Sequence, residues 1–309
     1  MRHLLSITDL GAQTLSNLID RGLAIARGEA QAVRPLAGKI VGIYFRRPST
    51  RTRTSFSVAA LKLGADIITY GPNDLQIVTG ESIQDTARVL SGFLDILVVR
   101  TNETLEEMKA LATQDAMSIV NAMSENEHPT QAIADLITIH EALGSLDGVH
   151  ILYIGEGNNS AAALAMAVGL TRGMRLTLVT PEGYGLPHSV LAQTRMLTRQ
   201  SGASIEQYHD LQHLPTNVDV VYTTRWETMG EPKSDTNWRQ KFDPYRVTPT
   251  LMKHVSKRAG TIFLHDLPAM RGSEVVNEVL DGAQSRAFQQ ARHKLTSAMV
   301  VLSWCAEVY

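Results

Sequence analysis

The segment Phe45–Gly64 reads FRRPSTRTRTSFSVAALKLG and joins a predicted strand to a predicted helix. The run KIVGIYF before it is strand-like, and the apolar residues after Ser49 recur at helical spacing: Phe56, Ala59, Ala60 and Leu63. Ser49 is a residue type that favours the position just before a helix, so the residues STRT lie at a helix N-terminus. Free backbone N–H groups, the helix dipole and the guanidinium of Arg51 would favour a phosphate dianion there. The alternative is an ordinary solvated cap, and no GxxxxGK[ST] loop is present.

The composition is that of a soluble globular protein large enough for two domains, with 309 residues, 44% of them hydrophobic and 19% charged. The net charge of −2 gives no electrostatic reason to expect a nucleic acid or a membrane surface as partner. The single cysteine, Cys305, excludes an internal disulfide and a cysteine-rich metal site. The start of the sequence lacks the apolar core of a secretory signal, and no run of 18 apolar residues occurs, so we expect a cytoplasmic protein.

Strand-like and helical patterns alternate along the chain, in two blocks. The expected strands are Ile40–Phe45, Asp66–Tyr70, Ile96–Arg100, Ser118–Asn121, Val149–Ile154, Arg175–Val179, Val218–Tyr222 and Thr261–Leu264. The expected helices between them include Ile83–Phe93, Pro129–Leu143 and Ala161–Arg172. This alternation predicts an α/β fold with two doubly wound parallel sheets covered by helices on both faces. Residues 225–245 are polar and weakly periodic, which predicts a long loop.

Two further clusters have residue types suited to catalysis. Pro129 opens a predicted helix, so His128 lies at its N-terminus, where the dipole disfavours imidazolium. A neutral histidine there can polarise a carbonyl oxygen, although a His-Pro pair is more often only a cap. The sequence His265-Asp266-Leu267-Pro268 follows the last predicted strand, and Arg100 ends an earlier one. The carboxyl ends of parallel strands are where open α/β sheets bind ligands.

Four motifs together resemble the aspartate/ornithine carbamoyltransferase family, in the same order and spacing and over nearly the whole chain. They are STRTRTSF after Phe45, GESIQDTARVL at 80–90, HPTQAIADL at 128–136 and HDLPAMRGSEV at 265–275. The resemblance implies a carbamoyl phosphate-binding domain at 1–143 together with a returning C-terminal helix at 285–309. It also implies an acceptor-binding domain at 144–284, a homotrimer with sites shared between subunits, and no metal or other cofactor.

The resemblance also implies a role for each site residue. The phosphate and carbamoyl group would be bound by Ser49, Thr50, Arg51, Thr52, Arg100, His128, Gln131, the backbone carbonyl of Leu267, and Lys294. Within this set the catalytic residues would be Arg51, Thr52, Arg100, His128 and Gln131. A neutral amine attacks the carbamoyl carbon, and fixed donors stabilise the charge that develops on the carbonyl oxygen. Phosphate leaves and can take the proton of the amine.

The acceptor side departs from both branches of the family. Ornithine enzymes carry Asp-x-Trp-x-Ser-Met-Gly where this chain reads TRWETMG at 224–230, so Thr224 replaces a carboxylate. The pair Thr224-Arg225 is similar to the aspartate branch, whose arginine binds the acceptor's carboxylate. Asp266 stands where ornithine enzymes have cysteine, and it would either hold a cationic acceptor or be an ordinary turn residue. The residues expected to contact the acceptor are Asn159, Thr224, Arg225, Thr228, Met229 and Asp266.

The main expectation is therefore an N-carbamoyltransferase with a non-standard acceptor, such as a small diamino acid. The alternatives are ornithine or aspartate carbamoyltransferase proper, and a non-catalytic relative that binds ligand. Thr79 and Lys294 stand where the family has a basic residue and an arginine, and both changes would weaken carbamoyl phosphate binding. A dinucleotide-dependent oxidoreductase has support only from Gly155-Glu156-Gly157, because Ser160 occupies the place of the third glycine.

Overall fold

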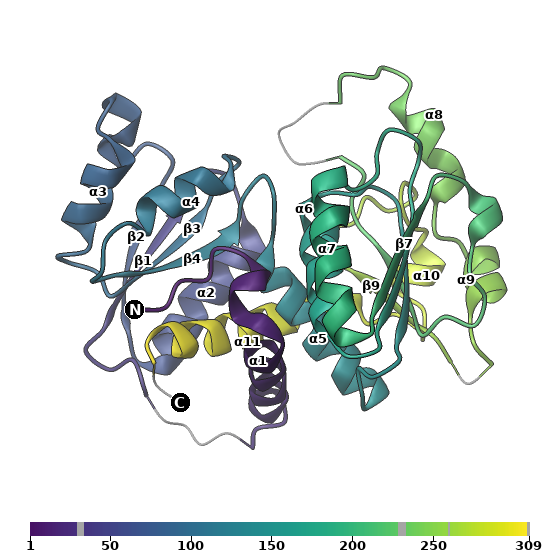
Figure 1. Cartoon of the computed structure of the whole chain (residues 1–309), viewed down its shortest axis with the longest axis horizontal. Helices are drawn as coiled ribbons and strands as arrows, with labels where there is room; N and C mark the ends of the chain where they lie inside the picture. The colour runs from purple at the N-terminus through teal and green to yellow at the C-terminus, as the bar shows by residue number, and fades with distance from the viewer. Residues whose placement is uncertain (30–33, 228–232, 259, 308–309) are drawn as a thin grey trace. The chain divides into compact units, whose positions relative to one another are not determined.

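The computed structural model describes residues 1–29, 34–227, 233–258 and 260–307, and the chain divides into two compact units (Figure 1). The first unit is Met1–Ile137 with Arg292–Tyr309, and the second is Thr138–Ala291. Each unit contains one parallel sheet, as the alternating sequence pattern predicts. Two parallel-sheet α/β units, with the final helix returning to the first, confirm the predicted fold class.

The sheet of the first unit has the strand order β2-β1-β3-β4, with all neighbours parallel. Its strands are β1 Ile40–Phe45, β2 Asp66–Tyr70, β3 Ile96–Arg100 and β4 Ser118–Met123. Its helices are η1 Ile7–Leu10, α1 Gly11–Ala26, α2 Thr50–Leu63, η2 Gln76–Thr79, α3 Ile83–Leu90, α4 Leu105–Leu111, the start of α5 Pro129–Leu143 and most of α11 Ala287–Cys305. Helices α3 and α4 lie on one side of this sheet, and α1, α2 and α11 lie on the other (Figure 1).

Strand β1 and helix α2 form as the opening segment predicts. The β1 residues from Val41 to Phe45 are buried, which is expected for a strand covered on both faces. Helix α2 buries Phe56 and Leu63, and it ends at Gly64, whose φ of 95° is a left-handed conformation that favours glycine. Local propensity and apolar spacing therefore agree with the observed packing in this part of the chain.

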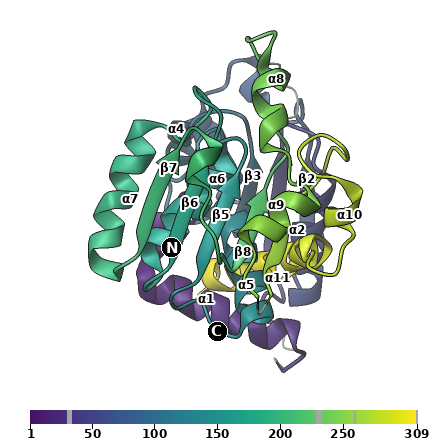
Figure 2. The ribbon, with the colours of Figure 1, turned by 90° about the vertical axis from the view of Figure 1, so that its right-hand side faces the viewer.

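The sheet of the second unit has the order β7-β6-β5-β8-β9, again fully parallel. Figure 2 faces this unit. Its strands are β5 His150–Ile154, β6 Arg175–Val179, β7 Ser204–Tyr208, β8 Val220–Thr223 and β9 Ile262–His265. Its helices, besides the end of α5, are α6 Asn159–Leu170, α7 His188–Ser201, η3 Leu211–His213, α8 Trp238–Phe242, η4 Asp243–Tyr245, α9 Pro249–Val255 and α10 Asn277–Leu280. Helix α6 is buried from Ser160 to Gly169, which its run of small and apolar residues permits.

Several predicted bounds shift by one to three residues in the structure, and two expectations differ in the kind of element. Strand β7 was not predicted, because it lies at the sheet edge and is exposed or half-buried, with the polar sequence SIEQY. The expected loop at 225–245 contains the short helices α8 and η4, whose five and three residues are too few for a helical pattern to show. Trp238 and Phe242 of α8 are buried in the core of the second unit.

Helix α11 packs on the first unit through specific side-chain contacts. The Ser297 hydroxyl donates to the Thr130 carbonyl at 2.7 Å, and the Ser118 hydroxyl donates to the Cys305 carbonyl at 3.2 Å. Cys305 is buried, and this burial raises the pKa of its thiol well above the ordinary value. A thiol held in its neutral form is a core residue rather than a nucleophile.

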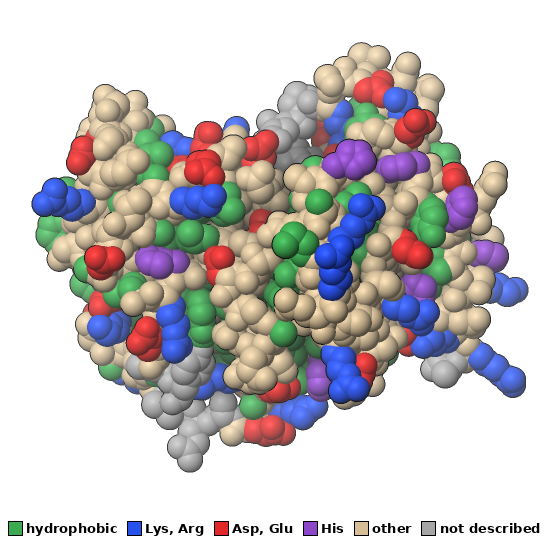
Figure 3. Space-filling model, viewed as in Figure 1, with side chains coloured by type: hydrophobic (Ala, Val, Ile, Leu, Met, Phe, Trp, Pro, Cys, Tyr) green, Lys and Arg blue, Asp and Glu red, His purple; other side chains and the backbone are tan. Residues whose placement is uncertain are grey.

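Charged side chains of both signs are intermixed on the face drawn in Figure 3. Among the described residues, no helix is long and apolar enough to cross a membrane.

A buried carboxyl group ties the N-terminal segment to the loop before α5. Glu127 is 2% exposed, and its Oε1 accepts the Ile7 backbone N–H at 2.6 Å. Burial raises the pKa of Glu127 to about 7, and the hydrogen bonds from Ile7 and Ser6 only partly oppose that rise. The folded chain therefore binds this proton more tightly than the unfolded chain does.

We expect the free energy of unfolding to fall, through Glu127, as the pH rises from the unfolded pKa near 4.5 through about 7. Glu127→Gln keeps the acceptor oxygen without the charge, so the variant should gain on the order of 3 kcal/mol over the wild type across that window. Urea unfolding at about pH 5 and pH 8 measures this difference. Glu125→Gln, at an exposed position in the same loop, is the matched control. A difference that does not change with pH would contradict the buried titration.

Candidate active site

Most of the predicted site residues lie just beyond the carboxyl ends of parallel strands. In the first unit, Ser49 follows β1, Arg100 ends β3 and His128 follows β4. In the second unit, Asn159, Thr224 and Asp266 follow β5, β8 and β9. The predicted site residues of each unit therefore gather at the carboxyl edge of its own sheet, where open α/β sheets bind ligands.

The N-terminus of α2 has the features of an anion site. Ser49 is the N-cap residue with an extended backbone, yet its hydroxyl makes no capping hydrogen bond to the described residues. At α3, by contrast, the Ser82 hydroxyl accepts the Asp85 amide. Arg51 is half-buried in the first turn, and Thr52 is buried beside it. The Ser49 hydroxyl and the first-turn amides thus form no capping hydrogen bond with each other. This arrangement suits the binding of an external phosphate.

Arg100, Thr52 and His128 form a buried polar group within the first unit. Arg100 Nη1 donates to Thr52 Oγ1 at 3.3 Å, and all three residues are at most 7% exposed. The pKa of His128 is well below its ordinary value, first because of burial and then because Lys294 and Arg100 are positively charged. The sequence predicts a neutral histidine from the helix dipole, whereas in the structure burial is the largest cause. A neutral imidazole beside a guanidinium can donate to a carbonyl oxygen without adding a second charge.

Gln131 lies between two charged side chains in the first unit. Lys294 Nζ donates to Gln131 Oε1, and Gln131 Nε2 donates to Asp135 Oδ1 at 2.7 Å. Gln131 is 1% exposed and Asp135 is fully buried. The structure thus brings Lys294, from the C-terminal helix, to a predicted site residue 163 positions earlier. Asp135 belongs to the HPTQAIADL motif, but no role for it is predicted from the sequence.

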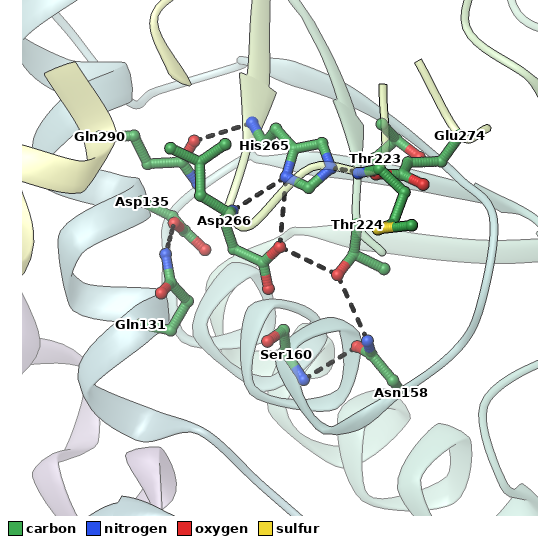
Figure 4. A network of polar contacts seen from close by, with 12 residues as sticks. Gln131, Asp135, Asn158, Ser160, Thr223, Thr224, His265, Asp266, Glu274 and Gln290 are labelled. Atoms are coloured by element: carbon green, nitrogen blue, oxygen red, sulfur yellow. Dashed lines mark hydrogen bonds and ion pairs between the residues drawn. The ribbon is translucent and has the colours of Figure 1, made fainter. Parts of the chain in front are cut away.

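A second polar network lies in the second unit (Figure 4). The Thr224 hydroxyl donates to Asp266 Oδ1 at 2.9 Å, and Asn158 Nδ2 donates to Thr224 Oγ1 at 3.4 Å. Asn158 Oδ1 also caps α6 by accepting the Ser160 amide. Since the Asn158 oxygen is used by the helix, Asn159 in the first turn of α6 stays the candidate for the acceptor's carboxylate.

Arg225 and its neighbours complete the described part of the predicted acceptor set. Arg225 is half-buried, and its Nε is buried with no hydrogen-bond partner among the described residues. Trp226 is buried in the core of the second unit. Thr228 and Met229 lie outside the described residues.

His265 fixes the backbone at Leu267. The Leu267 amide donates to His265 Nδ1 at 2.9 Å, and His265 Nε2 lies 3.1 Å from Glu274 Oε1. Because a backbone amide only donates, Nδ1 is unprotonated and Nε2 carries the hydrogen that faces Glu274. His265 and Glu274 are fully buried, and Leu267 has a positive φ of 51° before a cis bond to Pro268. Sequence reasoning quoted the motif but missed the pairing with Glu274.

Lys233 is a largely buried lysine that no sequence pattern indicates. Lys233 forms an ion pair with Glu156, and the side chains are only 9% and 16% exposed. The ammonium also lies 4.9 Å from the ring centre of Tyr184 and 5.5 Å from that of Trp238. Contacts of this kind stabilise a desolvated ammonium, so Lys233 anchors the segment before α8 to the loop after β5.

The glycines of the Gly155-Glu156-Gly157 sequence have a packing explanation. A Cβ at Gly157 would lie 2.5 Å from the backbone of Gly185 and Leu186, which is too close for any other residue. The Gly157 amide also donates to the Tyr184 carbonyl at 2.8 Å. Close approach of two chain segments accounts for Gly157 without a dinucleotide. No cluster of histidine, cysteine and acidic side chains suited to a metal ion occurs in the part of the chain that the structure describes.

Comparisons with known proteins agree over the whole length. Residues 2–141 match the family model of the aspartate/ornithine carbamoyltransferase carbamoyl-P binding domain, and residues 147–305 match that of the Asp/Orn binding domain. An ornithine carbamoyltransferase of Anoxybacillus flavithermus is 36% identical over 97% of this chain and 95% of its own. One from Acidothermus cellulolyticus is 38% identical over 98% and 96%. The solved ornithine carbamoyltransferase of Pyrococcus furiosus has a TM-score of 0.90 at 35% identity, covering 98% of this chain and 96% of its own.

Proposed function

The chain belongs to the aspartate/ornithine carbamoyltransferase family, and from this premise we propose that it carbamoylates ornithine with carbamoyl phosphate and releases phosphate. The observation that carries the proposal is the buried group of Thr52, Arg100 and a neutral His128 at the carboxyl edge of the first sheet. The comparisons do not support the non-standard acceptor that the sequence predicted. The relatives described above are named ornithine carbamoyltransferase, which favours ornithine.

The donor set follows from the chemistry of the first unit. In this proposal Ser49, Thr50, Arg51 and Thr52 bind the phosphate at the start of α2, where first-turn amides and the dipole add to the guanidinium. Arg100 and His128 donate to the carbamoyl oxygen, on which negative charge develops as the amine attacks. Gln131 contacts the carbamoyl nitrogen, and the Leu267 carbonyl, held by its own amide's bond to His265, also orients that nitrogen.

Lys294 is proposed to provide the positive charge at the carbamoyl end of the donor site. It donates to Gln131 Oε1 and lowers the pKa of His128 through its charge. Lysine is a compact charge without the two-pronged geometry of arginine, so it can neutralise the donor but cannot grip it at two points. We therefore expect the carbamoyl phosphate KM to be higher than in an enzyme with arginine at this position.

The acceptor set offers one fixed negative charge and one fixed positive charge. In this proposal Asp266, held by Thr224, receives an ammonium group, and Arg225 receives a carboxylate. Asn159, Thr228 and Met229 are the remaining proposed contacts. An α-amino acid with a second amine matches both charges and leaves that amine to react.

We expect Arg225→Ala to raise the ornithine KM about 10- to 100-fold, because a charge-assisted hydrogen bond to the acceptor's carboxylate is lost. The carbamoyl phosphate KM should change by no more than about twofold, because Arg225 is not in the donor set. Steady-state kinetics with each substrate varied in turn measures both constants. Arg195→Ala, at an exposed position on α7, is the matched control. Equal effects on both substrates would exclude an acceptor-binding role.

We also propose a homotrimer with shared sites. Apolar side chains are exposed on the first unit, on α2, β2, η2 and α3 and just after α3; they are Leu61, Ile68, Val78, Val89 and Phe93. Exposed apolar side chains on one unit suit an interface between copies. Light scattering coupled to size exclusion should give about three times the 33.9 kDa chain mass, and a monomer mass would contradict the proposal.

Phosphate release from carbamoyl phosphate with different acceptors tests the proposed function. The acceptors are ornithine, aspartate, lysine, 2,3-diaminopropionate and 2,4-diaminobutyrate, with the products identified by mass. Release with ornithine and formation of citrulline are the expected result. Turnover with aspartate alone, or with a shorter diamino acid alone, would show that ornithine is not the acceptor. The proposal of carbamoyl transfer would then stand with a different acceptor. Binding of carbamoyl phosphate without release for any acceptor would indicate the non-catalytic relative.

A further inference from the structure

The orientation of the Gln131 side-chain amide is set by its two neighbours. A lysine ammonium has donors only, so the Gln131 atom that faces Lys294 is the oxygen, Oε1. The nitrogen, Nε2, then faces Asp135 Oδ1 at 2.7 Å, and a carboxylate oxygen accepts that hydrogen bond. Figure 4 shows the Gln131–Asp135 contact. The charges of Lys294 and Asp135 therefore determine which end of the Gln131 amide is the oxygen and which is the nitrogen.

Asp135 lies one helical turn after Gln131 on α5 and is fully buried. Residues four apart face the same side of a helix, so the carboxylate meets the amide without any rearrangement of the backbone. A buried carboxylate is costly unless it accepts hydrogen bonds, and the Gln131 amide supplies one. This arrangement commits the amide nitrogen to the protein and directs the amide oxygen toward Lys294.

We propose that Asp135 is a positioning residue that makes Gln131 an acceptor, and so selects a donor substrate with an N–H group at the carbonyl carbon. This inference rests on the proposed function, in which Gln131 contacts the carbamoyl nitrogen. An amide oxygen has two lone pairs, so Oε1 can accept from Lys294 and from the substrate together. The guanidinium of Arg100 and the ammonium of Lys294 only donate, so neither can receive the carbamoyl N–H.

Acetyl phosphate is an analogue that cannot make this contact. It keeps the phosphate and the carbonyl of carbamoyl phosphate but carries a methyl group in place of the amine. A site built to hydrogen-bond a substrate N–H rejects an analogue that lacks it, because a buried polar group is left unpaired. Selectivity between the two acyl phosphates therefore reports the orientation of Gln131.

The experiment compares the wild type with Asp135→Leu and Asp135→Asn. The readouts are the carbamoyl phosphate KM and the inhibition constants of acetyl phosphate and inorganic phosphate, all with ornithine as acceptor. Leucine has the same branched shape and number of heavy atoms but leaves Gln131 Nε2 without the Asp135 acceptor, so the amide should rotate away. We expect the carbamoyl phosphate KM of Asp135→Leu to rise about 10-fold, with both inhibition constants within about twofold of the wild type. Asparagine can offer its oxygen to Nε2, so Asp135→Asn should restore a KM near the wild-type value.

The outcomes separate the inference from the proposed function. Suppose that the wild type is active and that Asp135→Leu changes the carbamoyl phosphate KM and both inhibition constants equally. The role of Asp135 would then be merely structural, and the inference would be overturned. If Asp135→Leu does not fold, Gln131→Met replaces it, since methionine fills the space without an acceptor oxygen. Unchanged selectivity in Gln131→Met would likewise overturn the inference. A wild type that releases no phosphate with any acceptor would refute the proposed function, and the role of Asp135 would fall with it.

Discussion

Arg51→Ala is expected to lower kcat/KM for carbamoyl phosphate by about 1000-fold or more while leaving the fold intact. Arg51 lies in the first turn of α2 and is half-buried, so truncation opens no core cavity. The guanidinium is the one formal charge of the STRT segment, and it supplies a two-pronged donor for a dianion that gains charge as it leaves. The inhibition constant of inorganic phosphate should rise in parallel, because phosphate uses the same contacts.

Three measurements decide the role of Arg51. Arg27→Ala, at an exposed position at the end of α1, should keep the wild-type rate and so controls for loss of a surface arginine. Arg51→Lys should recover part of the lost activity, because it keeps the charge but not the fork. Near-normal rates in Arg51→Ala, with unchanged phosphate inhibition, would show that the phosphate binds elsewhere.

His128→Ala is expected to lower kcat by about 100- to 1000-fold, with a smaller effect on the carbamoyl phosphate KM. This is the effect of removing one donor from a site that stabilises charge developing on an oxygen. The change falls mainly on kcat because the contact strengthens as the carbonyl oxygen gains charge. Pre-steady-state and steady-state phosphate release measure the step directly. His188→Ala, on the exposed start of α7, is the matched control.

The pH dependence gives an independent check on His128. Burial and the charges of Lys294 and Arg100 lower its pKa well below 6.5, so the imidazole stays neutral as the pH falls through that value. The wild-type kcat should therefore not fall as the pH drops through 6.5. His128→Gln, a variant that keeps a donor, should show a pH profile of the same shape in this range. A wild-type ionisation near 6.5 that is absent from His128→Gln would mean that the histidine titrates normally and works as a proton carrier.

The fold could be predicted where local pattern and burial agree. Strands β1, β2 and β3 begin and end at the predicted residues, and α5 does too, because Pro129 opens it and its apolar pattern is continuous. Strand β7 was missed because an edge strand with partial exposure needs no apolar run. Helix α8 was not predicted because it packs through two buried aromatic residues, and their burial depends on the rest of the second unit.

The sequence predicts candidate site residues only where they lie within a recognisable motif. The sequence brought out Ser49–Thr52, Arg100 and His128 because strand ends and helix starts are visible as patterns. It could not show that Glu274 lies against His265, or that Lys233 is buried against Glu156. Those pairs join segments through side-chain geometry, which no spacing rule encodes. The sequence also predicted an unusual acceptor from Thr224, Arg225 and Asp266 treated singly, whereas Thr224 and Asp266 form one hydrogen-bonded unit.

In the proposed function, the turn after β9 contacts the donor and the acceptor with different atoms. Its Leu267 carbonyl belongs to the backbone, whose direction is set by the bond from the Leu267 amide to His265. Its Asp266 carboxylate is a side chain that bonds to Thr224. On this proposal, a mutation at position 266 changes which amine is accepted and leaves the backbone carbonyl in place. We therefore expect single substitutions at this turn to change the acceptor preference while keeping the proposed donor contact.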